Sequence, residues 1–127
     1  MRIVFDTWQF VRIMVRLEET RNSDEDRASL WAAWFSDWQQ LDAELEHLRA
    51  VNFDHFATAM MDEEVILEPV DKAMVKTVAR LAREVAGELK STRQRVSKVA
   101  RNDLDFERAG LSLLASRLDD LAGSAKG

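Results

Sequence analysis

Hydrophobic residues recur every three or four positions over most of the chain, which is the period of an amphipathic helix. The clearest stretch covers residues 24–51, where six large apolar residues follow one another at alternating spacings of three and four: Trp31, Trp34, Trp38, Leu41, Leu45 and Leu48. Ser23 or Asp24 is placed to cap this helix. At about 1.5 Å per residue the helix is roughly 40 Å long, so the sequence predicts that it packs against long partners.

The first twenty residues allow two interpretations. Residues 11–17 alternate between apolar and mostly basic side chains, which is the period of a strand. At helical spacing the region from Ile3 to Leu17 instead forms a broad apolar face that includes Trp8 and leaves a narrow polar stripe. We favour the helix, because strand signals are poor in a chain with so few glycines and prolines.

The apolar stripe of the long helix changes phase at Asn52. A new apolar face begins there, formed by Phe53, Phe56, Ala57 and Met60. This change predicts a kink or a short separate helix, with Asp54 as a candidate cap. Residues 65–67 then lead to the single proline, Pro69, which suits the start of a third helix.

The third helix is predicted to be long and unbroken. Its core positions are Met74, Val78, Leu81, Val85, Leu89, Thr92, Val96 and Val99. Asn102 or Asp103 marks the turn into a fourth helix that ends before Gly123. The sequence therefore predicts an all-α protein, an antiparallel bundle of about four helices with the second and third long, in one domain over residues 1–123, followed by a frayed tail at 124–127.

Composition restricts the classes of function. The chain of 127 residues has no cysteine, 46% apolar and 32% charged residues, and only short apolar runs. It therefore lacks a disulfide framework, a thiolate metal site, a cysteine nucleophile and a stretch suited to a signal peptide or membrane span. We expect a globular cytoplasmic protein without a cofactor.

Charge is unevenly distributed around a net value of −5. Residues 1–70 carry 6 Lys+Arg and 15 Asp+Glu, whereas residues 71–101 carry 9 and 3. The candidate residues for nucleic-acid binding lie in the basic segment: Lys76, Arg80, Arg83, Lys90 and Arg101. No aromatic side chains are interleaved among them, so a solvated face that pairs with acidic surface is the preferred interpretation.

Metal and phosphotransfer chemistry have few candidate residues. A carboxylate-bridged di-iron bundle needs two Glu-x-x-His pairs, and this chain has one, Glu44 with His47, set off the apolar stripe. A phosphotransfer histidine needs an accessible ring on a long helix, with a lysine and a small residue on the next turn. Val51 lies one turn after His47, and that turn contains no lysine. His55 fits no better, so phosphotransfer is kept only as a minor alternative. We predict no catalytic residue and no metal ligand.

Aromatic residues provide the candidate partner-binding surface. Trp31, Trp34 and Trp38 share one stripe, whereas Phe35 is turned about 100° from Trp34 and lies on a flank. Tryptophan is enriched at protein interfaces, and methionine supplies adaptable apolar surface. The predicted partner-binding residues are Trp31, Trp34, Phe35, Trp38, Met60 and Met61. We expect the segment 53–61 to cover Phe35 or to yield its place to a partner helix.

The sequence-based hypothesis is a non-catalytic protein–protein interaction module, acting as a homo-oligomer or as an adaptor or chaperone. A homodimer is expected, because the apolar face of the first helix is wider than one neighbouring helix can cover. The alternative is a nucleic-acid-binding or nucleoprotein-associated subunit that uses the basic face of the third helix. A ferritin-like, metal-dependent oxidoreductase assembled across a dimer comes third. No membrane partner is expected.

Overall fold

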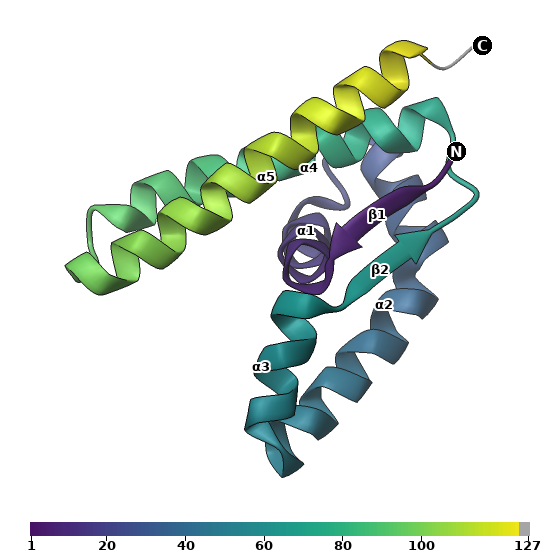
Figure 1. The fold of residues 1–127 in the computed structure, drawn as a ribbon. Helices are drawn as coiled ribbons and strands as arrows, with labels where there is room; N and C mark the ends of the chain where they lie inside the picture. Colours follow the sequence, from purple (N-terminus) through teal and green to yellow (C-terminus); the bar gives the residue numbers. More distant parts are fainter. Residues whose placement is uncertain (125–127) are drawn as a thin grey trace. The chain divides into compact units, whose positions relative to one another are not determined.

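The computed structural model describes residues 1–124, and 81% of the chain described is helical (Figure 1). The prediction of a largely helical protein is thereby confirmed. The described part contains five helices instead of about four, together with a two-stranded sheet. The chain divides into two compact units: an N-terminal unit, Arg2–Glu68, and a C-terminal unit that begins at Pro69 and includes Met1.

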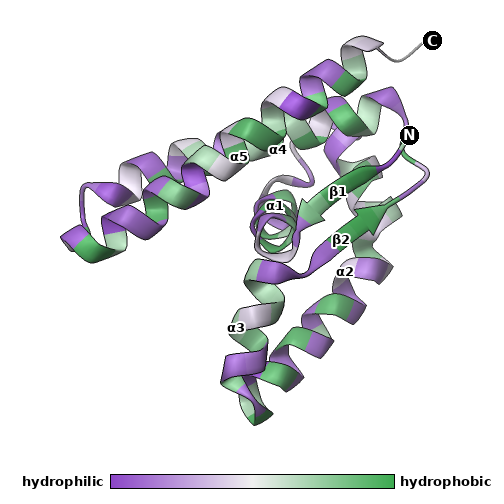
Figure 2. Cartoon of the chain, viewed as in Figure 1, coloured by the Kyte–Doolittle hydropathy of each residue, from purple (hydrophilic) through white to green (hydrophobic). Residues whose placement is uncertain are grey.

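The sheet of the N-terminal unit joins two segments about sixty residues apart. Strand β1 (Ile3–Asp6) pairs with β2 (Glu64–Leu67) in antiparallel register, with Val4 opposite Ile66. Both strands are predominantly hydrophobic (Figure 2). Ile3, Phe5 and Leu67 are buried, whereas Val4 and Ile66 lie on the exposed face.

The strands correct two expectations from the sequence. The first helix does not include Ile3 and Val4; α1 (Thr7–Thr20) begins only after β1 ends. Residues 65–67, expected to be irregular, lie in β2. The physical reason is that β1 finds its hydrogen-bonding partner far away in the chain, and a local periodicity carries no information on that pairing.

Thr7 closes the sheet where α1 begins. Its backbone N–H and its hydroxyl both donate to the carbonyl oxygen of Glu63, each at 3.0 Å. Asp6 precedes it and donates its N–H to Oε1 of Gln9 at 2.9 Å, which satisfies a backbone donor at the helix start. The first turn of α1 is therefore held to the residue that precedes β2.

Helix α2 (Glu25–Val51) has the bounds expected from its apolar stripe, with Asp24 as the cap. Oδ1 of Asp24 accepts the N–H of Arg27 at 2.8 Å, and its other carboxylate oxygen lies 3.4 Å from Nε of the same residue. The Arg27 side chain is buried and also donates to the hydroxyl of Thr20 at 2.7 Å. One carboxylate thus caps α2 and neutralises a buried cation at the α1–α2 turn.

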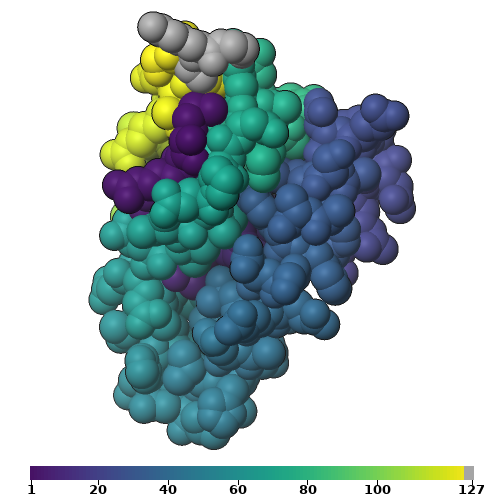
Figure 3. Space-filling view, turned by 90° about the vertical axis from the view of Figure 1, so that its right-hand side faces the viewer, coloured from purple at the N-terminus to yellow at the C-terminus, as the bar shows by residue number. Residues whose placement is uncertain are grey.

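Helix α3 (Phe53–Asp62) is separate from α2, as the phase change at Asn52 allowed. The N–H of Asn52 donates to the carbonyl of Leu48 at 2.8 Å, and its Oδ1 accepts the N–H of His55 at 3.1 Å. Asn52, rather than the expected Asp54, therefore ends α2 and caps α3. The two helices fold into a hairpin (Figures 1 and 3).

The C-terminal unit consists of α4 (Lys72–Arg93) and α5 (Lys98–Ser124), which pack as an antiparallel pair. Arg93 pairs with Asp105 near the turn, with Nε 2.8 Å from Oδ1, and Arg83 pairs with Asp119 farther from it. None of the helices within residues 1–124 combines the length and the apolar character needed to cross a bilayer.

The predicted third helix is interrupted earlier than expected. It ends at Arg93 instead of continuing to the expected turn at Asn102 or Asp103. The N–H of Arg101 donates to the carbonyl of Ser97 at 2.9 Å, and the Ser97 hydroxyl accepts the N–H of Ala100 at 3.4 Å, so Ser97 starts the next helix. Ser124, expected in a frayed tail, ends α5, and 125–127 lie outside the described residues.

Thr7→Val should reveal how much the closure at Glu63 stabilises the N-terminal unit. The change keeps the shape and the backbone N–H but removes the buried hydroxyl bond, so the free energy of unfolding should fall by about 1 kcal/mol. Urea unfolding followed by tryptophan fluorescence measures this, because all four tryptophans lie within residues 8–38. Thr58→Val is the control, because its exposed hydroxyl bonds within α3. Equal losses of unfolding free energy in the two variants would contradict a stabilising role for the bond between Thr7 and Glu63.

Asp24→Ala should destabilise the N-terminal unit more than an ordinary cap deletion does. It removes the cap of α2 and leaves buried Arg27 without its carboxylate, for an expected loss of about 2 kcal/mol or more. Asn52→Ala is the matched control, an exposed cap without a buried cation, with an expected loss of about 1 kcal/mol. The same fluorescence measurement applies. A smaller loss for Asp24→Ala than for the control would show that Arg27 needs no anion.

Candidate protein-interaction surface

Two of the predicted partner-binding tryptophans lie in the core of the N-terminal unit. Trp34 is 4% exposed, and its ring centre lies 6.1 Å from those of both Phe5 and Phe10. Trp38 is also buried, with its ring 6.1 Å from Phe10 in an edge-on arrangement. Tilted and edge-on contacts at these distances are favourable aromatic geometries. The rings join α2 to β1 and α1.

The other two aromatic candidates on α2 form a pair at the surface. The rings of Trp31 and Phe35 lie 5.3 Å apart, and the guanidinium carbon of Arg21 lies 5.3 Å from the centre of the Trp31 ring. Phe35 is 42% exposed, as expected for a residue on the flank of the stripe. We call Trp31 and Phe35 the aromatic pair. Arg21 covers part of it through a cation–π contact.

The two methionine candidates lie on α3, away from the aromatic pair. Phe35 precedes Asn52 by 17 residues and Met60 follows it by 8. At about 1.5 Å per residue, the two side chains are therefore displaced by about 13 Å along the hairpin. Residues 53–61 therefore do not cover Phe35, which is one of the two outcomes that the sequence allowed. Met60 and Met61 belong to a different surface.

Helix α3 carries apolar residues over much of its surface but buries only Ala59. Phe53 is 62% exposed and Met61 is 50% exposed, and Val51, just before the Asn52 turn, is 64% exposed. The rings of Phe53 and Phe56 lie 5.8 Å apart. We call the apolar side of this helix the α3 face; Phe53, Ala57 and Met61 are exposed on it, and Phe56 and Met60 are half-buried.

Helix geometry explains why the α3 face remains outside. Six residues separate Phe53 from Ala59, so at about 100° per residue their side chains point about 120° apart. Because Ala59 is turned towards the rest of the unit, Phe53 is turned away from it. The sequence identified this run as an apolar face, but it gave no sign that the small residue Ala59, and not the large ones, is buried.

Most charged side chains in the segment that contains the α3 face are acidic. Between residues 42 and 64 the chain has seven acids and one basic residue, Arg49, and all eight are exposed. The acids are Asp42, Glu44, Glu46, Asp54, Asp62, Glu63 and Glu64. The α2–α3 hairpin therefore presents an apolar surface in a strongly negative field.

Four of the five candidate nucleic-acid-binding residues are exposed on α4: Lys76, Arg80, Arg83 and Lys90. The turn at residues 94–97 places Arg101 on α5 instead. Arg83 forms an ion pair with Asp119, and Nε of Arg101 donates to the carbonyl of Arg93 at 3.2 Å. Arg80 donates to the hydroxyl of Thr77 at 3.3 Å. Of these interactions, the one between Arg83 and Asp119 is a pairing with an acid, as the preferred interpretation expects.

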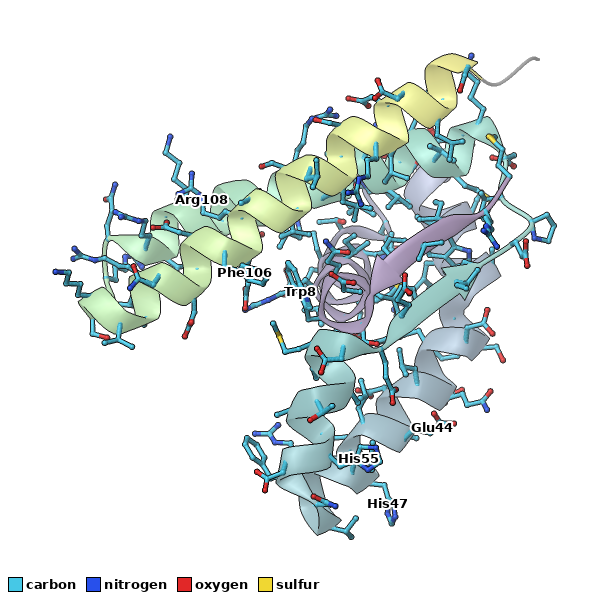
Figure 4. All side chains as sticks on the ribbon, in the orientation of Figure 1. Trp8, Glu44, His47, His55, Phe106 and Arg108 are labelled. Carbon is cyan, nitrogen blue, oxygen red and sulfur yellow. The ribbon has the colours of Figure 1, made fainter. Side chains whose placement is uncertain are left out.

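The residues considered for metal or phosphoryl chemistry lie on the α2–α3 hairpin. Glu44 and His47 are exposed on α2, and His55 is exposed on α3, near the end that contains the Asn52 turn (Figure 4). Over residues 1–124 no three His, Asp or Glu side chains come together as a metal site would need.

Comparison of the chain with protein-family models, curated proteins and solved structures yields no match. The site is therefore defined by the physical properties of its own residues.

Trp34→Ala and Phe35→Ala should have opposite consequences. Trp34 fills the core, so its truncation should cost about 3–5 kcal/mol and disrupt the N-terminal unit. Phe35 is an exposed flank residue, and Phe35→Ala should leave helicity and the unfolding midpoint nearly unchanged. If the aromatic pair binds a partner as the sequence predicts, complex formation by the folded Phe35→Ala variant should be lost. Circular dichroism and sedimentation equilibrium measure the two effects. Unfolding by Phe35→Ala would place this residue in the core.

Proposed function

We propose that this protein is a non-catalytic protein–protein interaction module and that the α3 face is its main binding surface. The observation that supports this proposal is the exposure of Phe53 and Met61 on a helix that buries only Ala59. Large apolar side chains gathered on one face are typical of an interaction site, whereas single exposed apolar residues need no explanation.

Two features make the α3 face a better candidate than the basic side of α4. Aromatic and methionine side chains are enriched in the cores of protein interfaces, and the α3 face contains both. By contrast, Arg83 on α4 is neutralised by Asp119, and no aromatic residue is available there to stack on a base. The aromatic pair on α2 extends the proposal as a second contact area, because Phe35 remains exposed.

Three further features stay predictions: the arrangement of the helices as one antiparallel bundle, the homodimer and the cytoplasmic location. A homodimer built on the α3 face would bring two acidic hairpins together, so self-association should strengthen when salt screens their repulsion.

Phe53→Ala tests the proposed surface. Truncating a buried aromatic anchor typically costs about 2 kcal/mol or more in binding, whereas truncating an exposed side chain leaves stability within about 0.5 kcal/mol. The variant should therefore keep its circular dichroism spectrum but lose self-association in sedimentation equilibrium, or lose the proteins that co-purify with the wild type from its native cell. Val15→Ala, a 44% exposed apolar residue on α1, is the control.

The proposal would be abandoned if the wild-type protein were a monomer and Phe53→Ala left its set of co-purified proteins unchanged. A Met61→Ala variant, changed at a second exposed position of the same face, guards against an effect peculiar to residue 53.

A further inference from the structure

We infer that the occupant of the α3 face is a cationic amphipathic helix of another protein. This inference rests on the proposed function and specifies the partner class for the same surface. Its basis is the combination of an exposed aromatic and methionine face with a surplus of six negative charges on the hairpin that presents it.

Charge decides the class of partner. The acids between residues 42 and 64 are exposed, and Arg49 is the single basic residue among them. A nucleic acid and an anionic lipid surface are both negative and are repelled by such a field. A partner with Lys or Arg around an apolar stripe is attracted, and its association is accelerated by the same field.

The chain's own basic helix is a poor occupant. Helix α4 carries Lys76, Arg80 and Lys90 on its exposed side, but its large apolar residues are buried. The buried apolar residues are Val75, Val78, Leu81, Val85 and Leu89. A second copy therefore has no free apolar stripe on α4 to place against the α3 face. Helix α5 does expose Val99, Phe106 and Leu113, but it carries five acids and four basic residues, so it is not a cationic helix. Neither helix combines an apolar stripe with positive charge, and this favours another protein.

The shape of the face favours a helix as the bound element. Phe53, Phe56, Ala57 and Met60 are spaced by three, four and seven residues, so they form a ridge along the axis of α3. Such ridges pack into the grooves of a second helix. Ten residues of α3 are about 15 Å long, which matches about three turns of a partner. Methionine adjusts to partners of differing shape.

The test uses two synthetic amphipathic peptides of about 18 residues, a length that permits helix formation on binding. Both have the same leucine face, and the polar face is lysine in one and glutamate in the other. Fluorescence anisotropy with the full-length protein should show binding of the lysine peptide alone. Phe53→Ala should weaken this binding at least about tenfold, and raising NaCl from about 50 mM to about 500 mM should weaken it as well.

Two double variants distinguish the effect of the acids at residues 42–64 from the effect of the net charge of the protein. Glu46→Gln with Asp62→Asn removes two acids of the hairpin, and Asp62 lies at the end of α3, where a negative charge does not stabilise the helix. Glu18→Gln with Asp37→Asn removes two exposed acids of the same unit outside residues 42–64. The first pair should weaken binding about threefold or more, and the second pair should have a smaller effect.

The peptide experiment and the Phe53→Ala variant together distinguish failure of the inference from failure of the proposed function. Equal binding of both peptides, or lysine-peptide binding that Phe53→Ala leaves unchanged, overturns the inference. If neither peptide binds while Phe53→Ala still abolishes self-association or a co-purified partner, the cationic helix is wrong and the proposed function stands. If Phe53→Ala and Met61→Ala, both folded by circular dichroism, change none of these readouts, both proposals fall.

Discussion

The pairing of β1 with β2 is the constraint on which the N-terminal unit depends. Four residues of each strand form the ladder, and Thr7 extends it by donating twice to the carbonyl of Glu63. Closing a loop of this length has an entropic cost that only a well-packed sheet offsets. The burial of Phe5 against Trp34 provides that packing, so the ladder and the aromatic core stabilise each other.

The pairing of β1 with β2, extended by Thr7 and Glu63, also determines which side of α3 faces solvent. Asn52 fixes the first turn of the helix, and Glu63, just beyond its last residue, is held by Thr7. A helix restrained at both ends cannot rotate about its axis to bury Phe53 without breaking one of these bonds. The exposure of the α3 face is therefore a consequence of the fold. The free energy that its apolar side chains can gain by leaving water remains available for binding.

Part of this arrangement was predictable because its cause is local. The bounds of α2 follow from its apolar stripe and from Asp24, and the separation of α3 follows from the phase change at Asn52. The strands were not predictable, because Val4 and Ile66 meet only after the intervening helices have folded back. The end of α4 had a local sign that the apolar period concealed. Ser97 caps the next helix, yet Val96 and Val99 on either side continue the spacing.

The candidate site was predictable in composition but not in position. The tryptophan stripe is a strong signal, but Trp34 and Trp38 are used to build the core, and Arg21 already covers part of the Trp31 ring. On α3 the signal is weaker, and the outcome depends on which side Ala59 turns inward. A small buried residue lets α3 approach the rest of the unit closely while its larger side chains remain outside. In this protein, burial of an alanine is therefore what leaves Phe53 and Met61 exposed, and this exposure is the basis of the proposed binding surface.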